Sequence, residues 1–381
     1  CMAVSAIGCG PSKSSQGTGN SDYRVAMITD SGDITDQSFN QTTYEACLEY
    51  CTENNIDFTY KKPDGDTDYA RIAMIDVAVA EGYNIIVMPG NIFAPALVEV
   101  TYKYPDVKFI ALDMTAGDII AAAVGSKYYD NPDAYEAADY YNTENTYCAV
   151  YQEEIPGYMA GYAAVKLGYR KLGFLGGQAV PAVMRYGFGY VQGINDAAKE
   201  LGITDQIEVE YAYGGQFYGS TEVTAAMDTW YSQGTEIVFA CGGGIFTSAA
   251  EAASKVDRKM IGVDSDQSPI IDAYGEGMTV TSAMKGLGAT VKAMLDSIIV
   301  TNTWEEHVGK IENLGLVSGT DMDVNYVGLP EDTTQWNENF TVDDYHELVR
   351  KIYDGEITID NSTEKMPEVS VKVNERQGSI M

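Results

Sequence analysis

The stretch KLGFLGGQAVPAVMRYGFGYVQGINDAAKEL, residues 171–201, decides the fold of this chain. Its first seven residues form a short apolar run that ends in two glycines, and residues 181–201 have the apolar spacing of a long helix. A run that is apolar on both faces is typical of a buried parallel strand. The stretch therefore predicts one strand–turn–helix unit of an α/β protein.

The same alternation of short apolar runs and helical segments continues along the chain in two series. The first series has expected strands at 24–29, 57–62, 84–90 and 107–113, with helices at 38–54, 68–82 and 93–104. The second series begins with the strand at 147–154 and runs to a helix at 341–354. Two doubly wound α/β units in tandem are typical of a cleft that closes by domain motion.

Composition indicates a folded, soluble and strongly acidic protein. The 381 residues are 45% hydrophobic and 21% charged, which is normal for globular domains and sufficient for two cores. The 56 acidic and 24 basic residues give a formal net charge of -32. Such a chain repels nucleic acid and anionic lipid, so neither is expected as a partner.

The first nine residues, CMAVSAIGC, resemble the end of a signal peptide, and residues 6–9 resemble a lipobox. We therefore expect lipidation at Cys9, followed by a Gly- and Ser-rich tether up to residue 22. An ordinary ragged terminus is the alternative. No apolar run elsewhere reaches the 18 residues that predict a membrane-spanning helix.

Catalysis, metal binding and cofactor binding have little support in the sequence. The chain has only two histidines, and its remaining cysteines, Cys47, Cys51, Cys148 and Cys241, are scattered. Nucleophile-elbow, zinc-protease and phosphate-loop motifs are absent, and the aspartate ladders at 64–69 and 321–326 lack the glycine of a calcium loop. We expect no enzyme activity, no metal and no cofactor.

The polar and aromatic residues at the carboxyl ends of the expected strands are the candidate site, because ligands bind there in open α/β sheets. From the first lobe these are Asp30, the turn at 36–40, Pro89 to Asn91, and Asp113. The second lobe adds the 176–186 loop with Arg185, Gly242 to Phe246, Asp264 to Asp266, Ser282 and Lys285. Aromatic, carboxylate, amide and lysine side chains together suit a small neutral ligand with a flat ring and several hydroxyls.

Several segments carry a specific resemblance to a known family. They include ITDSGDITDQSFNQTTYEA, FIALD, YQEEIPGYMAGYAA, CGGGIFTSAAEAA, IGVDSDQ and VTSAMK, and the longest is LGFLGGQAVPAVMRYGFGYVQGINDAA. In their order along the chain they resemble the BMP family of substrate-binding lipoproteins of ABC transporters, which includes purine nucleoside receptors. The resemblance implies a periplasmic-binding-protein type I fold, with two Rossmann-like lobes joined by three crossover strands.

The resemblance also implies roles for single residues in nucleoside binding. Phe39 and Phe246 would stack on the base, one from each lobe, and Asn40 and Asp113 would read its edge. Asp264 and Lys285 would hold the ribose hydroxyls. The remaining members of the expected ligand-binding set are Asp30, Asn91 and Gly244.

Each of these roles has a plain structural alternative. The two phenylalanines could be core aromatics, Asp264 and Lys285 a structural ion pair, and Asp113 a helix cap. Relatives often carry lysine where Gln37 stands here, which leaves the ligand class open between a nucleoside and another flat or polyol ligand such as riboflavin or a sugar.

With the family pattern, we expect a monomeric receptor, lipid-anchored at the outer face of a bacterial cell membrane, that hands a purine nucleoside to an ABC permease and its ATPase. A sensor without a transport role, or a nucleosidase, would be the other classes. The expected divisions are a leader and tether at 1–22, a first lobe at 23–148 plus about 278–312, a second lobe at 149–277 plus about 313–360, a polar tail at 361–381, and a tyrosine-rich insertion at 118–145.

Overall fold

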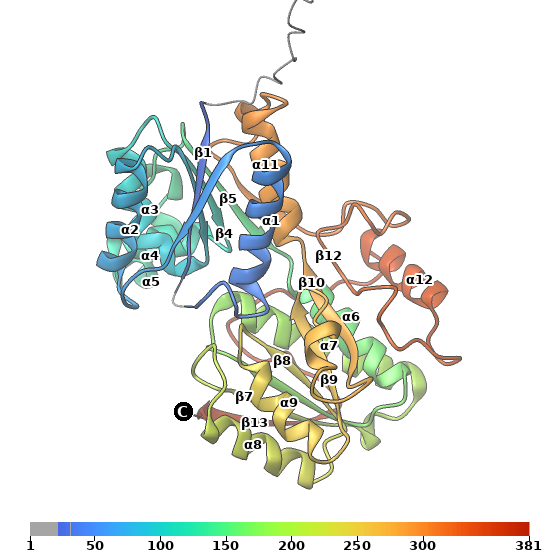
Figure 1. Ribbon diagram of the computed structural model, residues 1–381. Coiled ribbons are helices and arrows are strands. Elements are labelled where there is room, and N and C mark those ends of the chain that lie inside the picture. Colours follow the sequence, from blue (N-terminus) through green and yellow to red (C-terminus); the bar gives the residue numbers. More distant parts are fainter. Residues whose placement is uncertain (1–21, 31, 381) are drawn as a thin grey trace, which may run out of the picture.

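The computed structural model describes residues 22–30 and 32–380, which form two α/β lobes joined near the middle of the molecule (Figure 1). The sheet of the first lobe has the strand order β11 (Ile311–Leu314), β5 (Thr146–Tyr151), β4 (Lys108–Leu112), β3 (Ile85–Pro89), β1 (Arg24–Ile28) and β2 (Asp57–Lys61). All of its strand pairs are parallel. The predicted α/β architecture is therefore confirmed in the first lobe.

The second lobe repeats this plan. Its sheet has the order β12 (Val327–Gly328), β10 (Thr279–Lys285), β9 (Lys259–Asp264), β8 (Ile237–Cys241), β6 (Lys171–Gly176), β7 (Glu208–Tyr213) and β13 (Lys372–Ser379). Only the short β12 pairs antiparallel, with β10. The chain passes between the lobes after β5, after β10 and after β11, as the type I fold requires.

Helices cover both faces of each sheet. The first lobe has α1 (Phe39–Glu53), α2 (Asp68–Ala80), α3 (Ala94–Lys103), α4 (Ala116–Val124), α5 (Lys127–Asp130) and α11 (Leu287–Ile299), with 3-10 turns η1 (Asn91–Phe93), η2 (Pro132–Ala134), η3 (Ala137–Asp139) and η5 (Trp304–Glu306). The second has α6 (Glu154–Lys166), α7 (Pro181–Leu201), α8 (Thr221–Ser232), α9 (Phe246–Ser254), α10 (Ser268–Ile271) and α12 (Val342–Tyr353), with η4 (Thr204–Gln206). Alternate residues of β1 point to two separate apolar cores, because successive side chains of a strand face opposite sides.

The glycines of the 171–201 stretch allow α7 to pack against α6 at backbone distance. A Cβ added at Gly189 would lie 2.1 Å from the carbonyl oxygen of Glu154, and one at Gly193 would lie 2.0 Å from that of Tyr158. A real Cβ cannot approach so closely, so only glycine fits at these two positions. This contact fixes α7 against α6, and the first turn of α7 carries Pro181, Ala182 and Val183, which line the cavity between the lobes.

Two of the expected divisions need correction. Strand β10, placed in the first lobe from sequence, belongs to the second sheet, where it pairs with β9. The expected polar tail contains β13, which pairs with β7 at the sheet edge. An edge strand can be polar throughout, so β13 has no apolar pattern that sequence reading could detect.

The expected insertion at residues 118–145 is partly helical. It includes most of α4, whose Thr115 and Asp118 form a capping box.

Candidate functional site

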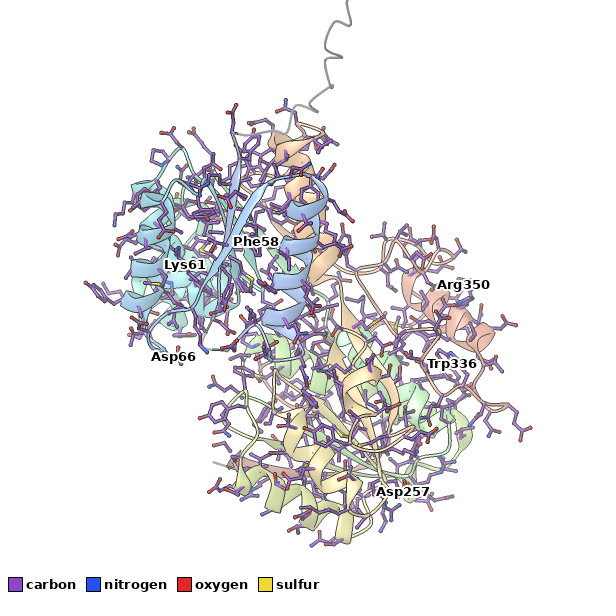
Figure 2. The ribbon with its side chains drawn as sticks, in the orientation of Figure 1. Phe58, Lys61, Asp66, Asp257, Trp336 and Arg350 are labelled. Carbon is purple, nitrogen blue, oxygen red and sulfur yellow. The ribbon has the colours of Figure 1, made fainter. Side chains whose placement is uncertain are left out.

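A cavity lies between the two lobes, at the carboxyl ends of strands from both sheets. From the first lobe it is lined by Asp30, Gly32, Asp36, Phe39, Asn40, Asp66, Gly90, Asn91, Ile92, Asp113, Thr115 and Asp118. From the second it is lined by Gln178, Val180, Pro181, Ala182, Val183, Arg185, Tyr186, Phe217, Cys241, Gly242, Gly243, Val263, Asp264 and Lys285. Asp66 marks the edge of the first lobe nearest the second (Figure 2). The cavity combines aromatic rings with an excess of carboxylates.

Most of the predicted residues meet in this cavity, and two do not. Those that line it are Asp30, Phe39, Asn40, Asn91, Asp113, Asp264 and Lys285. Gly244 lies outside it, in an isolated bridge with Tyr218. Phe246 is only 1% exposed and belongs to the apolar core of the second lobe, with Ile245 and Ala249 among its neighbours. The predicted stacking role of Phe246 is therefore wrong.

Phe217, in the loop between β7 and α8, is the phenylalanine of the second lobe that lines the cavity. Its ring lies against the glycine turns: a Cβ added at Gly177 would come within 2.5 Å of it, and one at Gly242 within 2.9 Å. The glycines that follow β6 and β8 thus make room for this ring. The sequence signal was present, because GGQF follows a predicted strand, but no residue of that loop was selected.

Phe39 is the first residue of α1 and is held by a carboxylate cap. Asp36 accepts hydrogen bonds from the backbone N–H groups of Ser38 at 3.0 Å, Asn40 at 2.9 Å and Gln41 at 3.0 Å. These donors have no partner within the helix, so Asp36 satisfies the helix N-terminus. The Nζ atom of Lys285 lies 4.9 Å from the centre of the Phe39 ring. The ring is thus fixed at the cleft beside a cation.

Asn40 is occupied by protein contacts. Its amide donates to Asp30 Oδ1 at 2.7 Å and to Asp36 Oδ2 at 2.9 Å, while its Oδ1 accepts from the Asp30 backbone N–H at 3.2 Å. Gly32 N–H also donates to Asp30 Oδ1, at 2.5 Å. Burial raises the pKa of Asp30 to about 6, although both hydrogen-bonded neighbours lower it. Asn40 therefore positions Asp30, which is the better placed of the two for contact with a ligand edge.

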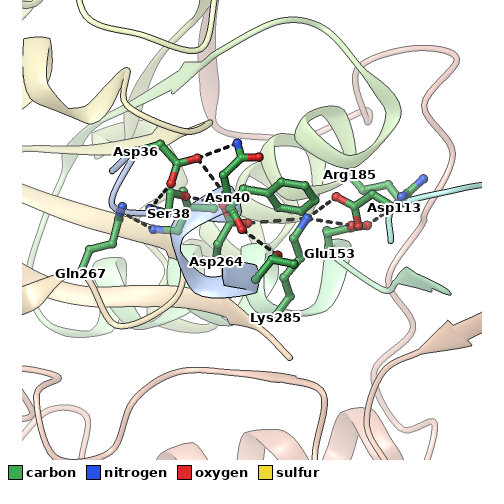
Figure 3. Close-up of polar contacts among 12 residues, drawn as sticks. Asp36, Ser38, Asn40, Asp113, Glu153, Arg185, Asp264, Gln267 and Lys285 are labelled. Carbon is green, nitrogen blue, oxygen red and sulfur yellow. Dashed lines mark hydrogen bonds and ion pairs between the residues drawn. The ribbon is translucent and has the colours of Figure 1, made fainter. Parts of the chain in front are cut away.

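A buried ionic cluster lies beside the cavity and includes Asp113, Arg185, Asp264 and Lys285 of its lining (Figure 3). The Lys285 Nζ atom lies 2.6 Å from Asp113 Oδ2, 3.5 Å from Glu153 Oε1 and 3.6 Å from Asp264 Oδ1. Arg185 Nε donates to Glu153 Oε2 at 2.7 Å. Three carboxylates thus face two cations between the lobes, and Lys285 connects strand ends from both lobes.

Burial and neighbouring charges shift the pKa values of residues in this cluster. Burial would lower the pKa of Lys285, but Asp113, Asp264 and Glu153 together raise it above its ordinary value. Burial raises the pKa of Asp113 to about 6 despite the opposing effect of Lys285. Asp113 and Asp264 also adopt φ angles of 54° and 67°, a left-handed conformation that is uncommon for residues other than glycine. Both carboxylates are held in strained conformations, as is frequent at binding sites.

Glu153 is not among the residues expected at the site, whereas Arg185 is expected at a strand end but without a ligand-binding role. Glu153 lies two residues after the end of β5, so the strand-end rule alone could have identified it. Its pairing with Arg185 and Lys285 joins segments 32 and 132 positions away in sequence, which only the tertiary fold can reveal.

The neighbouring Glu154 gives a prediction for stability. Burial raises the pKa of Glu154 from 4.5 to about 7, and its Oε2 has no hydrogen-bond partner among the described residues. Because the pKa is raised on folding, Glu154 favours the folded state fully below about pH 4.5, and this contribution is lost as the pH rises through about 7. Glu154→Gln should therefore raise the free energy of unfolding by about 1–3 kcal/mol at pH 8, with little gain at pH 4.5. Urea unfolding at both pH values measures this, and equal stabilities at pH 8 would contradict it.

Comparison with known proteins assigns the family. The Bmp family, described as ABC transporter substrate-binding protein PnrA-like, matches residues 23–363. The chain belongs to the Bmp family. As a Bmp protein it is a substrate-binding protein of an ABC transporter, a class that works outside the cytoplasm with permease and ATPase subunits. Among residues 22–30 and 32–380, no helix is long and apolar enough to cross a membrane.

Relatives in this family have low sequence identity to this chain but align with most of its length. The ABC transporter nucleoside-binding protein BmpA of Lactococcus lactis is 24% identical over 293 residues, which cover 72% of this chain and 74% of BmpA. A CD4+ T-cell-stimulating antigen of Listeria innocua is 25% identical and covers 92% of this chain and 93% of its own length. A solved ABC transporter solute-binding protein from Conexibacter woesei has a TM-score of 0.65 at 20% identity, covering 89% and 99% of the two chains. This last likeness supports the type I fold.

Proposed function

We propose that this Bmp protein captures a nucleoside, with a purine base, in the cleft between its lobes and delivers it to the permease. The observation that carries the proposal is the pair of phenylalanines, Phe39 and Phe217, which line one cavity from opposite lobes. Aromatic side chains contribute about 1–3 kcal/mol per stacked base and tolerate different bases. The name of the Lactococcus lactis relative, a nucleoside-binding protein, supports the same ligand class.

The polar groups that line the cavity fit the two halves of a nucleoside. Asp30, held by Asn40, is placed to accept a hydrogen bond from a ring N–H or amino group. Asp113, expected from the family resemblance to read the base edge, lies 2.6 Å from Lys285, so we propose it for the ribose instead. Asp113, Asp264 and Lys285 then offer two acceptors and a donor to the vicinal hydroxyls. A phosphate would meet this carboxylate-rich wall, and the two cations of the described cavity lining, Arg185 and Lys285, are already paired, so a nucleotide should be rejected.

The proposed cycle makes and breaks no covalent bond. The open lobes admit the ligand, and closure brings the contacts of both lobes onto it while excluding water, which strengthens each polar contact.

We further infer that Cys9 carries a lipid and that the following residues tether the lobes to the membrane surface. An "Uncharacterized lipoprotein" of Pyrococcus abyssi is 25% identical over 299 residues, in support of this. Cys9 lies outside the described residues, and mass spectrometry of the mature N-terminus tests the lipid.

A thermal-shift screen tests the ligand class. Inosine, guanosine and adenosine should raise the melting temperature, because a ligand that binds only the folded state stabilises it. Free bases, ribose and nucleoside 5′-monophosphates should raise it much less. If riboflavin or a sugar raises the melting temperature and no nucleoside does, the proposed ligand class is wrong and that compound indicates the correct class.

A further inference from the structure

The turn that carries Phe39 is contacted directly by the opposite lobe (Figure 3). Gln267 Nε2, in the second lobe, donates to the backbone oxygen of Gln37 in the first lobe at 2.8 Å. Beside it, Ser38 Oγ donates to Asp264 Oδ2 at 2.5 Å, again across the cleft. Ser38 and Gln267 are both 0% exposed. We call these four residues the cross-lobe latch.

Gln267 is held rigidly within its own lobe. Its Oε1 accepts from the Val263 N–H at 2.9 Å, and its backbone N–H donates to Ser282 Oγ at 3.1 Å. Gly262 provides the space, because a Cβ there would lie 2.8 Å from the Gln267 Cβ. Because the Gln267 Oε1 atom is occupied inside its own lobe, the Nε2 atom of the same amide points its N–H group at the opposite lobe.

The receiving turn is also preorganised. Gln37 adopts a φ of 56°, in the left-handed region, and its N–H donates to Gln41 Oε1 at 3.1 Å. Gln37 lies directly between Asp36, which caps α1, and Ser38 at the start of that helix. A bond to the Gln37 oxygen therefore fixes the peptide two residues before Phe39.

We propose that Gln267 is a positioning residue for ligand capture: through the cross-lobe latch it favours the closed cleft and slows ligand release. The latch consists of protein groups alone, so it stabilises the closed lobes whether or not a ligand is bound. Opening the lobes must break both latch bonds. The prediction about ligand release rests on the proposed function, because it assumes that the cleft binds a nucleoside.

The variant Gln267→Glu isolates the crossing bond. Glutamate keeps the size of the side chain and the acceptor for Val263, but it places an oxygen against the Gln37 carbonyl instead of a donor. Loss of one such bond should speed inosine release by about tenfold in stopped-flow measurements at pH 8. The association rate should change less, because the latch forms on closure after encounter. Without ligand, small-angle X-ray scattering should show a larger radius of gyration than for the wild type.

Gln335→Glu is the matched control. Gln335 Nε2 also donates to backbone oxygens at 2.8 Å, those of Gly277 and Thr279, but all three residues belong to the second lobe. The same substitution there should lower stability without changing the release rate or the radius of gyration. Equal effects of the two variants on both readouts would overturn the inference.

Ser38→Ala removes the second latch bond and provides a test should Gln267→Glu fail to fold. It should raise the release rate and the radius of gyration in the same directions. Unchanged values for it, or for a folded Gln267→Glu, would overturn the latch. If inosine does not bind the wild type, the proposed function fails, and the scattering comparison alone decides on the latch.

Discussion

Replacing Lys285 by methionine is expected to lower the free energy of unfolding by about 3–5 kcal/mol, the cost of leaving buried charges without their partner. Asp113, Asp264 and Glu153 all lie within 3.6 Å of the Lys285 ammonium group, and its side chain is 3% exposed. Without Lys285 these carboxylates would repel one another in a medium that screens charge poorly. Urea denaturation at pH 7.5 measures the change.

Lys292→Met is the matched control for this experiment. Lys292 lies on α11 and pairs with Glu49 at 2.7 Å, but its side chain is 40% exposed. An exposed ion pair contributes little, so this variant should change stability by less than about 1 kcal/mol. Equal losses in the two variants would show that the buried cluster does not depend on its lysine.

Phe39→Ala and Phe217→Ala are each expected to weaken nucleoside binding by about 5- to 150-fold, which corresponds to the loss of one stacking contact. Both rings line the cavity, one from each lobe. Phe246→Leu should leave the affinity within about twofold, because the Phe246 ring lies in the apolar core, where a swap between apolar residues is tolerated. Isothermal titration calorimetry with inosine compares the three variants.

The pattern across these variants distinguishes the two assignments. Loss of binding in Phe39→Ala and Phe217→Ala, with retention in Phe246→Leu, supports the pair seen in the structure. Retained affinity in Phe217→Ala together with loss in a folded Phe246→Leu would restore the assignment made from the sequence.

Sequence reading was sufficient where a physical rule ties a residue to its place in the sheet. Short apolar runs identified the strands. The rule that ligands bind at the carboxyl ends of parallel strands identified Asp30, Asp113 and Asp264, which line one cavity from the two sheets. Lys285 was also found in this way, because it ends β10. These positions follow from local pattern and parallel topology alone.

Sequence reading failed where the direction of a side chain decides its role. Phe246 and Phe217 both follow glycines after a strand, and only the path of each loop determines which ring enters the cleft. Asn40 was correctly placed, but its amide is used by Asp30 and Asp36, and those bonds depend on the folded turn. The assignment of β10 to the second lobe likewise depends on which sheet accepts the strand.

The most direct test of the central claim is a calorimetric titration of the wild-type protein with inosine, hypoxanthine and ribose. If the cleft binds base and sugar together, inosine should bind at one site per chain and at least about 100-fold more tightly than either half, since each half uses only part of the contacts. The absence of inosine binding, or binding no tighter than that of hypoxanthine or ribose alone, would contradict the account.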